Sequence, residues 1–198
     1  MKTLFYIFFT ALLISCSQAP SKHLVAEDLK YSAYRFYTNP QTDNWDFYLA
    51  HYINISENGH FVAMRHDSFM DDPKYYEGEI SDEVIKLIDS KLHEVHFRAD
   101  YSWKDEDAFI YDGFTYCIDY KNINTYDRNK IQFIPNNSPE QIKSLVPVFD
   151  SLFFKANIKV SKINLDEYSE QLKQLYISVN GPLIKAKKVA PIVLPSDK

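Results

Sequence analysis

The clearest pattern in the chain is an alternation of apolar and polar positions over residues 45–55. One set of alternating positions holds Trp45, Phe47, Leu49, His51, Ile53 and Ile55, and the other holds Asp46, Tyr48, Ala50, Tyr52 and Asn54. A period of two over this length predicts a half-buried antiparallel strand with the first set facing the core. Asn58-Gly59 follows it and predicts a type I′ hairpin turn, so residues 60–66 are expected to return as the partner strand.

Further segments predict strands at 29–36, 114–120 and 131–134. Helices are predicted where the spacing of apolar residues lengthens from two to about 3.6. One follows the capping residue Ser81, and a second begins at Ser138-Pro139 and should be kinked by Pro147, which has no N–H to donate. A third begins at Asn164 and ends at Asn180-Gly181. These elements predict an α+β fold, in which an antiparallel sheet built from hairpins carries two packed helices and a C-terminal helical appendage.

The first residues have the pattern of a secretion signal. Lys2 provides a positive charge, and residues 4–14 form an uncharged apolar run that is shorter than the roughly 20 residues of a spanning helix. Cleavage by the ordinary signal peptidase between residues 11 and 19 is one interpretation, but it leaves Cys16 unexplained. Leu13-Ile14-Ser15-Cys16 resembles the lipobox of bacterial lipoproteins, which implies that Cys16 is acylated on its thiol and becomes the first mature residue.

We therefore expect residues 1–15 to be a signal peptide and 16–28 a tether. An α+β domain should cover 29–155, with a helix and tail at 156–198. The lipid should anchor the protein to the membrane without a spanning segment, with the outer membrane and its periplasmic face as the expected location. Envelope proteins and glycans are then the expected partners.

The expected domain is similar to an uncharacterised domain family of bacterial lipoproteins. The shared features are the 55–59 hairpin, the 78–81 segment before a helix, Tyr101 after it, and Pro139 opening a last helix ahead of Asp150. The chain departs from the family between residues 37 and 44, where it has no cysteine. The family carries no assigned activity, so the resemblance implies a topology and no function.

Composition narrows the classes of function. The chain has 22 Lys+Arg and 27 Asp+Glu, and without Lys2 the mature charge is 21 − 27 = −6. Without a basic block, nucleic-acid binding is not expected. Only 4 glycines are present, and no phosphate-binding loop or nucleophile elbow occurs. Once Cys16 is acylated, Cys117 has no intramolecular partner, and its place in a strand predicts a buried, inert thiol.

Two segments resemble metal sites at first sight. His93-Glu94-Val95-His96 spaces its histidines at i and i+3 instead of i and i+4, and the apolar stripe of this helix directs His93 away from the core. We therefore interpret it as helix surface. Residues 105–107 with Asp112 resemble a calcium loop, but the positions that require Gly and Glu hold Ile110 and Tyr116, so a solvated acidic loop is expected. No metal or cofactor is expected.

Tyr48 and Tyr52 are the candidate binding residues, because they fall on the strand face opposite the apolar set. Exposed tyrosines would offer a rigid contact surface, whereas a second packed layer would bury them. On the first interpretation, truncating both to Ala should cost less than about 1 kcal/mol of stability. No assembled nucleophile, base and oxyanion set is visible. A non-catalytic binding or scaffolding role is therefore favoured, with an envelope hydrolase or metal-dependent enzyme using His51, His66 or the acidic loop as the alternative.

Overall fold

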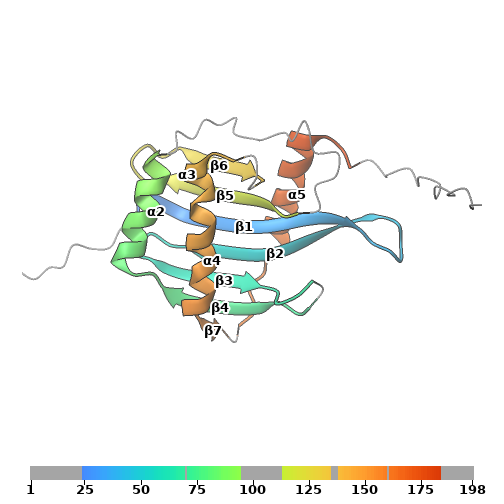
Figure 1. The fold of residues 1–198 in the computed structure, drawn as a ribbon, viewed down its shortest axis with the longest axis horizontal. Coiled ribbons are helices and arrows are strands. Elements are labelled where there is room, and N and C mark those ends of the chain that lie inside the picture. Colours follow the sequence, from blue (N-terminus) through green and yellow to red (C-terminus); the bar gives the residue numbers. More distant parts are fainter. Residues whose placement is uncertain (1–23, 70, 95–112, 135–137, 160, 184–198) are drawn as a thin grey trace, which may run out of the picture.

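The computed structural model describes residues 24–69, 71–94, 113–134, 138–159 and 161–183. Its centre is a seven-stranded antiparallel sheet in the order β6-β5-β1-β2-β3-β4-β7, with helices on both faces (Figure 1). This confirms the expected α+β class. The strands are β1 (Ala26–Thr38), β2 (Trp45–Ile55), β3 (His60–Arg65), β4 (Lys74–Glu79), β5 (Thr115–Asn122), β6 (Arg128–Phe133) and β7 (Asn157–Lys159). The helices are α2 (Asp82–Glu94), α3 (Glu140–Lys143), α4 (Leu145–Lys155) and α5 (Asp166–Asn180).

The predicted hairpin between β2 and β3 is confirmed, but its turn is not of type I′. Of the two turn residues, Gly59 alone has a positive φ, at 83°. The Gly59 N–H donates to the carbonyl of Ser56, and the Ser56 N–H donates to the carbonyl of His60. The turn therefore places its left-handed residue last, at the position where a side chain would be strained.

The first face of the sheet, here called the α4 face, is covered by α2, α3 and α4 (Figure 1). Its core is almost entirely aliphatic and aromatic. Tyr31 from β1 stacks on Phe149 from α4, with ring centroids 4.6 Å apart, and both side chains are fully buried. Ile53, Ile118 and other strand residues complete this layer.

The opposite face, here called the α5 face, is covered by α5. Tyr168 and Leu172 are the buried residues of this helix, and they pack against Tyr34, Tyr52 and other strand side chains. The predicted appendage is thus a layer of the fold. The sheet also continues past residue 155, because β7 pairs with β4. The expected end of the domain therefore does not coincide with the end of the sheet.

The second helix begins near the expected position but is divided into α3 and α4 around Ser144. The interruption falls where Pro147 was expected to act, because its missing N–H would have donated to the carbonyl of Lys143, the last residue of α3. Pro147 itself lies in the first turn of α4, where backbone N–H groups have no partner within the helix. The third helix begins as expected, with Asn164 accepting a hydrogen bond from the Asp166 N–H. None of the helices in the described ranges is long and apolar enough to cross a membrane.

Candidate functional site

A β-bulge in β2 decides where the candidate tyrosines lie. Ala33 of β1 pairs with His51, but the next residue, Tyr34, pairs with Leu49. Ala50 is the extra residue, so the alternation of faces is interrupted there. The prediction that residues 45–55 alternate without a break is therefore wrong. Tyr52 falls on the α5 face, whereas Tyr48 falls on the α4 face.

Tyr52 belongs to the packed layer under α5. It is 5% exposed, and its ring lies 5.0 Å from that of Tyr168 in an edge-to-face arrangement. Burial raises the pKa of Tyr52 to about 12. The hydroxyl of Tyr168 is itself within hydrogen-bond distance of Ser32 Oγ, at 3.2 Å. For this residue the structure favours the second packed layer over a binding surface.

Tyr48 lies instead in an aromatic cluster at the end of the α4 face, beyond α4. Its ring is 4.8 Å from Phe69, and its hydroxyl donates to the carbonyl of Ser68. The Arg35 guanidinium lies over Phe69 at 4.4 Å and over Phe114 at 5.4 Å. We call this cluster the aromatic end. Its members are Arg35, Tyr37, Tyr48, His66, Phe69 and Phe114.

The aromatic end combines buried and exposed rings. Tyr48 is 9% exposed, whereas Phe69 is 44% exposed. In Figure 1 the long strands β1 and β2 extend past α4 on this side, which explains why no helix in the described ranges covers it. His66 is fixed against Tyr48 by a contact of 2.6 Å from its Nδ1 to the carbonyl of Asp71.

His51 borders the aromatic end and faces α4. Its Nδ1 is buried and lies 3.8 Å from Oδ1 of Asp150, too far for a hydrogen bond but close enough for an ion pair. Tyr31 donates its hydroxyl to the same carboxylate at 3.2 Å. Burial and then the Asp150 charge raise the pKa of Tyr31 well above its usual value, so it stays a donor. The Asp150 carboxylate thus lies on the Nδ1 side of the imidazole.

Arg65 lies directly opposite His51, on β3. Its guanidinium is surrounded by the rings of Tyr76, Phe153 and Phe154, at 5.5–5.7 Å. One nitrogen, Nη2, donates to Asp67 at 3.1 Å. The rings hold the cation in place through cation–π contacts, and its side chain remains 25% exposed.

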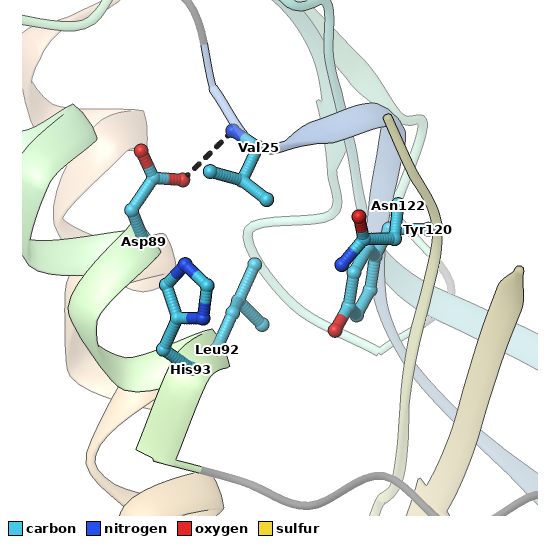
Figure 2. A pocket seen from close by; sticks show the side chains of 6 residues that line it. All are labelled: Val25, Asp89, Leu92, His93, Tyr120 and Asn122. Atoms are coloured by element: carbon cyan, nitrogen blue, oxygen red, sulfur yellow. Dashed lines mark hydrogen bonds between the residues drawn. The ribbon is translucent and has the colours of Figure 1, made fainter. Parts of the chain in front are cut away.

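His93, from the segment that resembled a zinc motif, is exposed at the rim of a small cavity of about 20 Å³ between α2 and the start of β1 (Figure 2). Asp89, one turn earlier, accepts the Val25 N–H at 3.1 Å. Burial raises the pKa of Asp89. The cavity has room for about one water, which is too little for a ligand. It lies beside Val25, where the described chain enters the domain, and we interpret it as part of that junction. It is lined by Val25, Asp89, Leu92, His93, Tyr120 and Asn122.

The α5 face contains a buried charge cluster. Asp119 is fully buried, and its two oxygens lie 2.7 Å from Arg128 Nε and 3.2 Å from Lys130 Nζ. Asp28, with a positive φ of 54°, lies 3.8 Å from Arg128. Since both cations are partly exposed and close to the carboxylate, we interpret this cluster as structural.

Cys117 is buried within the same face, as its strand position indicated. Desolvation raises its pKa to about 12. A thiol that stays protonated at neutral pH is a poor nucleophile, so the geometry gives no support for covalent catalysis by this residue.

Several predicted residues lie outside the described ranges. These are Cys16, His96 and the acidic loop of 105–107 with Asp112. Among the described residues, no group of three or more His, Cys, Asp or Glu side chains is arranged to hold a metal ion. His51, Arg65 and Asp150 come together only in the fold, and no motif in the sequence joins them. Comparisons with models of protein families, with curated proteins and with solved structures found no match.

Proposed function

We propose that this protein is a lipid-anchored protein of the cell envelope that binds a ligand at the aromatic end without catalysing a reaction. The observation that carries the proposal is the cluster of Phe69, Phe114 and Tyr48 around the Arg35 guanidinium, with Phe69 44% exposed. Aromatic side chains and arginine are the residues most often found at the centre of binding surfaces, because they present large rigid contact areas.

The position of the cluster along β1 fits this role. Arg35 lies nine residues after Ala26, at which β1 begins, or about 30 Å along an extended strand. If the lipid is on Cys16, the chain enters the domain at the start of β1 and the aromatic end lies at its far end. A ligand or partner could then be reached without competition from the membrane surface.

A photo-reactive amino acid placed at position 69 of the full chain in cells tests the binding role. We expect it to cross-link to one discrete species, and the yield should fall at least about fivefold when Phe114 is also replaced by Ala. The matched control is position 126, because Tyr126 is also an exposed aromatic, 74% exposed and with a Lys121 amine 5.5 Å from its ring. Equal capture at both positions would contradict the proposal.

The lipid anchor is tested separately. Labelling with a clickable fatty acid should be lost when Cys16 is replaced by Ala, because the thiol is the expected acylation site. Labelling that persists in this variant would remove the anchor while leaving the binding role to be judged by the cross-linking result.

A second candidate, an envelope hydrolase, is favoured by the His51–Asp150 pair. A carboxylate on the Nδ1 side of a histidine leaves Nε2 as the nitrogen that could act as a general base, and closure of the 3.8 Å gap would be needed to form the hydrogen bond of a catalytic pair. The described contacts of His51 are with Asp150 and the Phe153 ring, neither of which supplies a nucleophile. Turnover of a panel of ester and amide substrates that disappears in His51→Gln would favour the hydrolase over the binding protein.

A further inference from the structure

Two nitrogen-bearing side chains face the same side of the sheet at the border of the aromatic end. His51 and Arg65 are direct cross-strand partners, so their Cβ atoms are about 4.5–5.5 Å apart. Both reach toward α4, since each contacts the Phe153 ring. The bulge at Ala50 places Tyr48 on the same face, and the His66 ring, 5.0 Å from Tyr48, follows Arg65 in the chain. The pair and the aromatic end thus lie next to each other along β2.

Arg65 has donors to spare. A guanidinium carries five N–H donors, and among the described residues a single acceptor, Asp67, is within hydrogen-bond distance of it. That carboxylate is shared with Lys74, which also pairs with Asp67. The centroids of the three rings lie 5.5–5.7 Å from the guanidinium carbon, so a ligand that reaches the remaining N–H donors also meets aromatic surface.

His51 can add a second donor. Asp150 faces Nδ1, so the outer nitrogen, Nε2, belongs to the part of a side chain that is 30% exposed. With a proton on Nε2, the ring presents an N–H donor next to Arg65. Asp150 from α4 and Arg65 from β3 are the charged groups that face His51, and Tyr31 from β1 reaches it through Asp150.

The formal charges next to the pair balance one another. Among the described residues there, Arg65 and Lys74 carry positive charge, and Asp67 and Asp150 carry negative charge. The attraction for an anion therefore comes from the N–H donors that Arg65 does not use, and not from a net charge. Asp150 repels an anion, but it already accepts the Tyr31 hydroxyl and lies on the Nδ1 side of the ring.

We propose that His51 and Arg65 form an oxyanion-binding subsite, so that the ligand of the aromatic end carries a carboxylate or phosphate group next to an apolar part. The inference rests on the proposed binding function and adds the chemical class of its ligand. Arginine binds both oxyanions through parallel N–H donors, and the rings alongside accept the apolar part.

Three small probes distinguish the possibilities: benzoate, phenyl phosphate and the neutral benzamide. Each is titrated into the full chain in detergent at about pH 6, and amide shifts of β2 and β3 report binding. We expect at least one of the two anions to bind about tenfold more tightly than benzamide, because a charge-assisted contact is stronger than a neutral one. Which anion binds more tightly identifies the carboxylate or the phosphate as the natural group.

Variants assign the effect to the two residues. Arg65→Gln and His51→Gln should each weaken anion binding about five- to tenfold and leave benzamide binding unchanged. Lys143→Gln is the matched control, since it removes an exposed positive charge on α3, 46% exposed and paired with Glu140. Equal loss in the control would mean that overall charge is responsible, and the subsite would be wrong.

If all three probes bind equally, the subsite is refuted while the aromatic end stands. If no probe shifts amides near Phe69 and Phe114, the subsite and the binding role at that end both fail.

Discussion

The two faces of the sheet differ in the chemistry of their buried side chains. The α4 face is covered by three helices and filled by aliphatic and aromatic side chains, with Tyr31 stacked on Phe149 at its centre. The α5 face is covered by one helix, and its interior contains hydroxyl groups, a thiol and a buried carboxylate. There the Tyr34 hydroxyl donates to Gln132 at 2.7 Å.

The difference has a physical meaning. Apolar packing contributes most to stability and can be kept by repacking after a small shift of a helix, whereas a buried hydrogen bond is lost if the helix docks out of register. We infer that the α4 face provides most of the stability of the domain and that polar contacts on the α5 face fix where α5 lies. Four predictions test this comparison.

The largest effect is expected at Phe149. Replacing it with Ala should lower the free energy of unfolding by about 3–5 kcal/mol, because it leaves a cavity in the most densely packed layer. The matched change on the other face, Leu172→Ala, should cost about 2–3 kcal/mol, since a single helix can settle into the space. Denaturant unfolding measures both. A larger loss for Leu172 would reverse the comparison.

The next largest losses of stability are expected for Tyr48 and Tyr52. Tyr52→Ala should cost about 3 kcal/mol and Tyr48→Ala about 2 kcal/mol, because both side chains are buried, at 5% and 9% exposure. This replaces the small combined loss expected from the sequence, which assumed that both faced solvent. Unfolding of the two single variants and the double variant measures it. A combined loss under 1 kcal/mol would mean that the strand relaxes without them.

Asp119→Asn should cost about 1–2 kcal/mol, because Arg128 and Lys130 lose a charged acceptor but stay partly in water. Asp28→Asn in the same cluster is the control and should be close to neutral. Asp28 is 39% exposed, and Asn tolerates its positive φ. If the two variants lose equal stability, the burial of Asp119 has no special role in the α5 face.

The smallest effect concerns Cys117 at alkaline pH. Its pKa is raised from 9.0 to about 12 in the folded chain, so above about pH 9 the unfolded chain loses this proton while the folded chain keeps it. The contribution of the protonated thiol to the free energy of unfolding is complete below pH 9 and is lost as the pH rises towards 12. The free energy of unfolding should therefore fall between pH 9 and 10.5, less steeply in Cys117→Ala. An unchanged slope in that variant would contradict the buried thiol.

The comparison also explains which predictions from the sequence failed. The period of two in β2 was a sound reason to expect a strand, and the strand is present. The bulge at Ala50 has no signature in the pattern, since Ala suits either face. One extra residue reverses the faces of everything before it, so Tyr48 and Tyr52 were assigned to one face when they lie on two.

Other features were missed for related reasons. β4 contains Gly78 and two glutamates, and β7 has three residues, so neither presents an alternation long enough to read. Gly78 is required because a Cβ there would come within 2.9 Å of the Phe61 ring. The placement of α5 was missed because its apolar stripe shows that it packs but not on what.

The sequence by itself determined the α+β class, the positions of most strands and helices, the buried thiol, and an N-terminal pattern that predicts a lipid anchor. These features depend on the spacing of apolar residues, on helix caps and on short motifs, all of which involve residues close together in the chain. The tertiary structure decided the side of the sheet on which α5 lies, the bulge in β2, and the meeting of His51, Arg65 and Asp150. Such contacts join residues up to about a hundred positions apart, and their geometry depends on strand register, which no local pattern specifies.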